Sequence, residues 1–185
     1  VNVLIAQGLY SEVFDTMTFS LKAYPNDKWI LYEAGWYHFL YGDHAQAMTL
    51  MGRATTLFSK EELYNEPICM PAMEFAYFKR QNGLAEQAQS IIEQCQQLLL
   101  NARAADYQAS DYDYLEARIA AFNNNLPEAI QALEVAYSKG WRERWSQFDP
   151  LFINISNEPR VKSIFEKINR NLDETRTLIE ADGSL

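Results

Sequence analysis

Two histidines and two cysteines are the residues of this sequence best suited to catalysis or metal binding. His38 and His44 are six residues apart, so on one helix they face away from each other, and we expect structural positions for both. The sequence has no glycine-rich phosphate loop, no nucleophile elbow and no paired-histidine metal motif. Its 25 acidic residues are scattered, with no pair in an apolar setting. We therefore predict a non-enzymatic protein with no catalytic residue, no metal site and no cofactor.

The composition is that of a folded, acidic and helical protein. Of 185 residues, 48% are hydrophobic and 22% are charged, which provides a core and excludes an intrinsically disordered chain. The 7 glycines and 6 prolines are fewer than tight-turned β folds need. No stretch reaches the roughly 18 apolar residues of a membrane span. The formal charge is −9, which disfavours nucleic acid as the direct partner. Most of the excess lies in residues 61–120, which form either a solvated acidic face or a surface that favours a basic partner.

The elements that would position any binding residues show an internal repeat. Four segments open with Gly or Asn and have a small or β-branched residue five positions later: Gly8 and Val13, Gly42 and Ala47, Gly83 and Ala88, Asn124 and Ala129. Gly or Asn supplies the left-handed residue that ends one helix, and small residues let two antiparallel helices approach closely. The pattern therefore predicts helical hairpins, which stack because one hairpin alone buries too little surface.

This spacing resembles the tetratricopeptide repeat, whose period is about 34 residues. Residues 28–61 match best, at Leu31, Ala34, Gly35, His38, Gly42, His44, Ala47, Met51 and Ala54, with histidines in place of two usual tyrosines. Residues 1–27 match as a partial hairpin, and residues 69–102 and 110–137 match more loosely. In residues 110–137, Asp113 and Glu116 stand where the family has large apolar residues. The resemblance implies an all-α fold, a right-handed superhelix of about four antiparallel hairpins.

The distances between the turn residues predict two insertions. Gly42 follows Gly8 by 34 residues, but the next two intervals are 41 residues each. The extra seven residues fall near 62–68 and 103–109. The first insertion contains Pro67, so we expect a loop or a short extra turn there. The second continues a run without helix breakers, so we expect a longer helix.

The resemblance also implies a partner-binding groove lined by the first helix of each hairpin. The corresponding side chains in the second, third and fourth hairpins are Trp29, Tyr32, Trp36 and Phe39; Met70, Met73, Tyr77 and Arg80; and Asp111, Tyr114, Arg118 and Ala121. Aromatic and arginine side chains are typical of binding hot spots. We expect recognition of a peptide or protein, with Trp36, Tyr77 and Arg80 among the anchors. Three alternatives stay open: the rings pack internally, they bind a small ligand and control an attached effector, or they form a homodimer contact.

The C-terminal part, residues 138–185, departs from the repeat. We expect a capping segment after Gly140 and a last helix with Pro159 in its first turn. Gly140-Trp141-Arg142, Asp149-Pro150-Leu151 and Glu158-Pro159-Arg160 resemble the C-terminal end of bacterial multidomain proteins that join these repeats to a winged-helix, cyclase or kinase domain. The resemblance implies the partner-binding part of a larger bacterial regulator. Its compartment stays open between the bacterial cytoplasm and, if the two cysteines form a disulfide, the periplasmic side of a membrane-anchored protein. The first repeat starts partway through a helix, so we expect a longer parent protein.

The hairpin arrangement allows one prediction for the cysteines. Cys69 would begin the first helix of the third hairpin, and Cys95 lies near the end of the partner helix. Antiparallel pairing places both at one end of the hairpin, where a disulfide forms if the Cα atoms come within about 7 Å. Closing that loop would add about 3–4 kcal/mol. The alternative is two buried, reduced cysteines.

Overall fold

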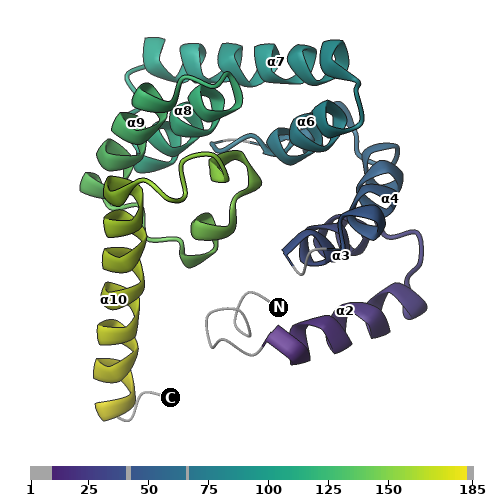
Figure 1. Cartoon of the computed structure of the whole chain (residues 1–185), viewed down its shortest axis with the longest axis horizontal. Coiled ribbons are helices and arrows are strands. Elements are labelled where there is room, and N and C mark those ends of the chain that lie inside the picture. The colour runs from purple at the N-terminus through teal and green to yellow at the C-terminus, as the bar shows by residue number, and fades with distance from the viewer. Residues whose placement is uncertain (1–9, 41–42, 66, 183–185) are drawn as a thin grey trace. The chain divides into compact units, whose positions relative to one another are not determined.

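A computed structural model describes residues 10–40, 43–65 and 67–182, and the described chain is almost entirely helical (Figure 1). This confirms the predicted all-α class. The chain divides into two compact units, one up to Gln94 and one from Cys95. Each unit is described below by itself. The anchors Gly8 and Gly42, and the first part of the partial hairpin, lie outside the described residues.

The first unit contains α2 (Tyr10–Ala23), α3 (Lys28–Leu40), α4 (His44–Thr55), α5 (Lys60–Leu63) and α6 (Ala72–Gln81). Helix α3 begins where the Asp27 carboxylate accepts hydrogen bonds from the backbone N–H groups of Trp29 and Ile30. Asp43 caps α4 in the same way by accepting from Gln46. Helix α3 packs against α4 and against α2. These two caps set where the helices of the predicted 28–61 hairpin begin.

Close approach of α3 and α4 depends on small residues. A Cβ atom added at Gly35 would lie 2.9 Å from the Met51 Cγ atom and 3.3 Å from the Ala47 carbonyl oxygen. Ala47 and Ala54 are fully buried on the facing side of α4. By contrast, nothing lies within 4 Å of a Cβ atom added at Gly52. The small positions that the repeat pattern predicts in α3 and α4 therefore lie at the helix contact.

The first insertion forms the end of α5 and a short antiparallel pair, β1 (Tyr64–Asn65) and β2 (Met70–Pro71). Cys69 lies between the strands in a left-handed conformation, with φ 56°, and α6 begins only at Ala72. The prediction that Cys69 begins this helix is therefore wrong. The reason is local, since the residue before a proline is disfavoured in helical conformation and Pro71 follows Met70.

The second unit contains α8 (Ser110–Phe122), α9 (Leu126–Ser138), the 3₁₀ turns η1 (Arg144–Phe148) and η2 (Pro150–Phe152), and α10 (Pro159–Ala181). The unit boundary falls inside α7 (Ala85–Ala104), whose 20 residues exceed the 12 of α4, as expected for the second insertion. Helices α8 and α9 form a tightly packed pair, and the turn between them has Asn124 at φ 58°. Gly140, at φ 109°, follows the end of α9.

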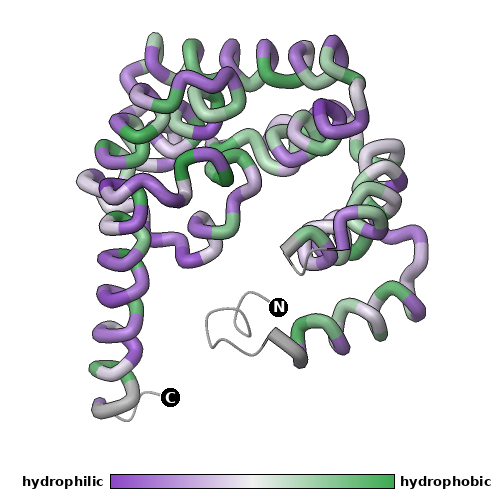
Figure 2. The backbone as a smooth tube through the Cα atoms, in the orientation of Figure 1, coloured by the Kyte–Doolittle hydropathy of each residue, from purple (hydrophilic) through white to green (hydrophobic). Residues whose placement is uncertain are grey.

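The last helix packs on α9 and η1, and its buried residues lie in its first half. Its buried residues are Val161, Ile164, Phe165 and Ile168. Residues 173–179 are exposed, and this part of α10 is mostly hydrophilic, as its colours in Figure 2 show. The helix begins at Pro159, the residue that the sequence predicts in its first turn.

Candidate partner-binding site

Most side chains of the predicted groove lie in the core. Tyr32, Trp36, Phe39, Met73, Tyr114, Arg118 and Ala121 are buried. Met70, Tyr77, Arg80 and Asp111 are half-buried, and Trp29 is 42% exposed. The prediction that this whole set faces a partner is therefore wrong, because buried side chains contribute little contact surface. Of the three proposed anchors, Trp36 is core, and Tyr77 and Arg80 keep part of their surface.

In the first unit, rings that are distant in sequence enclose the predicted groove residues. Phe58 packs edge-on against Trp29, with centroids 4.7 Å apart, and lies 5.7 Å from Phe75. Tyr32 meets Phe75 edge-on at 5.9 Å. Such pairs add about 0.5–1.5 kcal/mol each beyond the area they bury. Tyr32 thus serves the packing of α3 rather than recognition.

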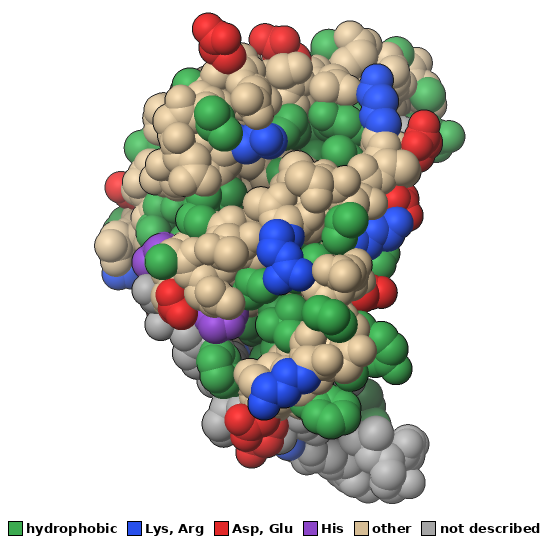
Figure 3. Space-filling view, turned by 90° about the vertical axis from the view of Figure 1, so that its right-hand side faces the viewer, with side chains coloured by type: hydrophobic (Ala, Val, Ile, Leu, Met, Phe, Trp, Pro, Cys, Tyr) green, Lys and Arg blue, Asp and Glu red, His purple; other side chains and the backbone are tan. Residues whose placement is uncertain are grey.

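The first unit has a half-open cavity of about 390 Å³ where the end of α3, the start of α4 and the end of α6 meet. Phe39 forms its centre and meets Tyr77 and Phe78 edge-on, each at 5.6 Å, and His44 at 5.0 Å. The described residues that line it are Phe39, His44, Ala45, Met48, Tyr77, Phe78, Gln81 and Asn82. On the face in Figure 3, histidine side chains border hydrophobic ones, and charges of both signs are interspersed. The cavity combines apolar walls with a polar edge.

The helix ends place the polar groups at the edge of this cavity. The Asp43 cap makes His44 the first residue of α4. Gly83, with φ +75°, follows the end of α6 and leaves Gln81 and Asn82 exposed there. Burial raises the pKa of Tyr77, so its hydroxyl stays protonated at neutral pH and available for hydrogen bonding. Phe39 and Tyr77 were among the predicted site residues, whereas the helix-end amides were not.

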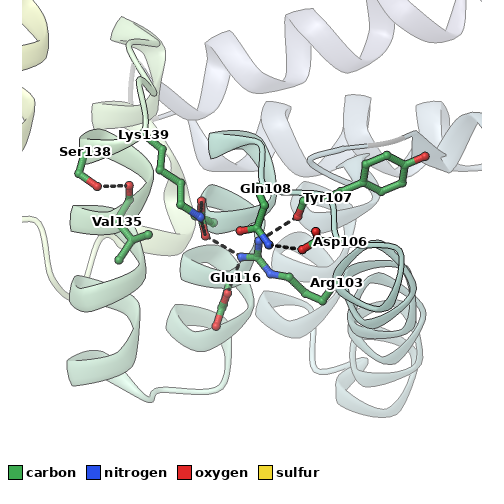
Figure 4. Close-up of polar contacts among 9 residues, drawn as sticks. Arg103, Asp106, Tyr107, Gln108, Glu116, Val135, Ser138 and Lys139 are labelled. Carbon is green, nitrogen blue, oxygen red and sulfur yellow. Dashed lines mark hydrogen bonds and ion pairs between the residues drawn. The ribbon is translucent and has the colours of Figure 1, made fainter.

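A charged network in the second unit accounts for the acidic residues that depart from the repeat pattern (Figure 4). Arg103 of α7 contacts Asp113 at 2.6 Å and Glu116 at 2.9 Å, and Lys139 contacts Asp113 at 2.9 Å. Burial lowers the pKa of Arg103, but its hydrogen bonds to Glu116 and Asp113 outweigh this effect and raise the pKa overall. Two cations thus balance two carboxylates across α7, α8 and the end of α9.

A buried ion pair joins the C-terminal segment to α8. Asp149 accepts a hydrogen bond from the Tyr114 hydroxyl at 2.8 Å, and its Oδ2 atom lies 2.8 Å from Arg118 Nε. Both charged side chains are 0% exposed. The Tyr114 ring stacks on Trp141 with centroids 4.0 Å apart. Tyr114 and Arg118 therefore hold the C-terminal segment, which explains why they are not surface residues.

The cysteines and histidines do not form a reactive centre in the described residues. Both cysteines are disulfide-bonded, and neither is free. His38 Nδ1 lies 3.3 Å from the Asp43 carboxylate, next to the Phe14 ring, and His44 packs on Phe39. Within the ranges that the structure describes, no three His, Cys, Asp or Glu side chains are arranged to hold a metal ion.

Comparison of the chain with protein-family models, with curated proteins and with solved structures finds no match. None of the described helices has both the length and the apolar character needed to cross a membrane.

Proposed function

We propose that this chain is a non-enzymatic recognition module of the tetratricopeptide type, which binds a peptide segment of a partner protein. In this proposal it forms the partner-binding part of a larger bacterial regulator. The observation that carries the proposal is the aromatic cavity of the first unit, formed by three helix ends. A large apolar side chain of the partner fills this cavity.

The chemistry of the cavity supports a peptide ligand. Phe39, Phe78 and Met48 offer an apolar floor for an anchoring side chain. Gln81 and Asn82 present amides that both donate and accept, which suits the backbone of an extended peptide. Burying one large apolar side chain contributes about 1.5–3 kcal/mol, which corresponds to about 10- to 100-fold in affinity.

The packing of the helix pairs supports the repeat assignment. Gly35 and Ala47 allow the close contact of α3 with α4, and Ala117 and Ala129 are fully buried in the α8–α9 pair. These are the positions at which the repeat pattern places small residues. The left-handed residues Gly83 and Asn124 also stand at equivalent turns.

A peptide selection tests the proposed site. Random peptides are displayed on phage and selected on the whole chain, and the affinities of the selected peptides are measured by fluorescence anisotropy. We expect a shared large apolar residue, whose replacement by alanine weakens binding at least tenfold. Ala45→Trp fills the cavity and should weaken binding similarly, whereas Gln46→Trp, at the next exposed position of α4, should not. Peptides that bind both variants equally well would refute the site.

A small-ligand sensor is the second candidate, and the size of the cavity favours it. A volume of about 390 Å³ lies within the range of about 300–1,000 Å³ that small-molecule pockets occupy. Native mass spectrometry of the chain purified from its own organism distinguishes the two candidates. A retained small molecule that Ala45→Trp eliminates would favour the sensor.

A further inference from the structure

The second unit has a cavity of its own, of about 380 Å³, with a different chemistry. It lies where α7 passes the end of α8 and the start of α9. Its lining comprises Gln96, Leu99, Leu100, Glu116, Ile119, Ala120, Asn123, Asn125 and Glu128. No aromatic ring takes part, and the described lining residues include two carboxylates and no basic side chain.

The floor of this cavity is aliphatic. Ile119 and Ala120 of α8 are buried there, and Leu99 of α7 is half-buried beside them. Leu100 also lines the cavity and is 61% exposed. Exposed leucine and half-buried leucine together offer a surface on which a flexible methylene chain can lie.

The edge of the cavity is acidic and polar. Arg103 contacts one oxygen of Glu116, Oε2, at 2.9 Å and so fixes that carboxylate. The Asn125 side-chain amide donates to Glu128 Oε2 and holds that carboxylate near the start of α9. Gln96 and Asn123 add two more amides to the lining. The cavity thus has an apolar base and two oriented carboxylates.

We propose that this cavity binds the side chain of a basic residue, arginine or lysine, in a segment of a protein partner. The methylene stem would lie on Leu99, Leu100 and Ile119, and the cation would reach Glu128 and Glu116. Long basic side chains combine these two preferences, and charge-assisted hydrogen bonds to carboxylates are about twice as strong as neutral ones. This inference does not depend on the peptide site of the first unit.

Peptide titrations observed by NMR test this site on the whole chain. The probes are acetyl-Ala-Ser-X-Ser-Ala-amide peptides in which X is arginine, citrulline, norleucine or glutamate. Citrulline keeps the shape of arginine and removes its charge. We expect saturable shifts of the Leu100, Asn123 and Glu128 amide signals with the arginine peptide. The citrulline and norleucine peptides should bind at least threefold more weakly, and 0.5 M salt should weaken arginine binding.

Two charge-neutralising variants separate a site from the general field of an acidic protein. Glu128→Gln should weaken arginine binding about threefold, as expected for one exposed charge pair. Glu86→Gln removes the same charge from an exposed position on α7 outside the cavity and should leave binding unchanged. Far-UV circular dichroism confirms that both variants fold. Equal binding of the arginine and citrulline peptides, equal effects of the two variants, or no shifts up to 10 mM peptide would each overturn the proposal.

Discussion

The buried pair of Arg118 and Asp149 makes one substitution, Asp149→Asn, unusually informative. The Asp149 carboxylate receives three contacts: Arg118 Nε at 2.8 Å, the Tyr114 hydroxyl at 2.8 Å and the Leu151 backbone N–H at 3.0 Å. Neither charged side chain is exposed to solvent. Replacing the carboxylate by an amide leaves the guanidinium of Arg118 buried beside a group that carries no negative charge.

The expected cost of Asp149→Asn is about 3–5 kcal/mol of unfolding free energy, the range for removing one partner of a buried ion pair. Tyr114→Phe removes one hydrogen bond to a charged acceptor and should cost about 2 kcal/mol. In the double variant the cost of Tyr114→Phe should fall, because its acceptor has already lost its charge. The cost of Tyr114→Phe in the wild-type chain minus its cost in the Asp149→Asn variant measures the coupling of the hydroxyl to the carboxylate.

The matched control is Asp173→Asn, the same substitution in the same unit. Asp173 pairs with Arg144, but its side chain is 62% exposed, so solvent screens the pair. We expect a loss below about 1 kcal/mol. Equal losses for the two Asp→Asn variants would refute the inference that burial makes the Arg118 pair costly to break.

Urea unfolding followed by fluorine NMR provides the assay. The chain has four tryptophans, and protein labelled with 5-fluorotryptophan gives a signal for each. Trp141 and Trp145 pack on Tyr114, so their signals report the environment of the ion pair. Separate signals matter because the two units need not unfold in one transition.

Three further predictions concern the first unit and the cysteines. Gly35→Ala should lower the unfolding free energy by about 1–3 kcal/mol, because the added methyl group meets the facing helix. Gly52→Ala should raise the unfolding free energy by about 0.5–1 kcal/mol, because its methyl group meets no other atom and alanine favours the helix. Urea unfolding measures both. A thiol assay on denatured, unreduced protein should find no free thiol from Cys69 or Cys95, and two would contradict the disulfide. Burial raises the pKa of Glu33 above its ordinary 4.5. The wild-type chain should therefore be as stable as the Glu33→Gln variant below pH 4.5 and should lose stability relative to it as the pH rises through the raised pKa. A pH series of melting curves checks this.

Local spacing predicted the turns at Gly83 and Asn124 and the approximate ranges of the helix pairs in residues 28–61 and 110–137. The left-handed conformations of Gly83 and Asn124 and the close contact at Gly35 follow from residue type at fixed intervals. These features depend on neighbours within one hairpin. The same spacing located both insertions, although the helix after the first one begins later than predicted, since Cys69 and Pro71 form a tight turn instead.

Burial of the predicted groove was not predictable from spacing, because the covering groups are distant in sequence. Tyr32 is covered by Phe58 and Phe75, and Tyr114 by a segment about 35 residues further along the chain. A helical period tells which residues share a face, but not what covers that face. The cavity of the first unit was partly predictable, since Phe39 was among the predicted residues. Its edge depends on where α6 ends, which the groove pattern does not specify.

The attachment of the C-terminal segment to α8 has a consequence for how such a protein can change in length. Tyr114 and Arg118 present a surface that Trp141, Asp149 and Phe152 occupy with irregular backbone and buried side chains. A further hairpin inserted directly after α9 would have to displace that segment and break the buried contact of Asp149 with Arg118. Duplication of a hairpin directly after α9, during evolution or by design, is therefore opposed. The ion pair of Arg118 and Asp149 therefore fixes the C-terminal segment directly after the last helix pair, α8 and α9.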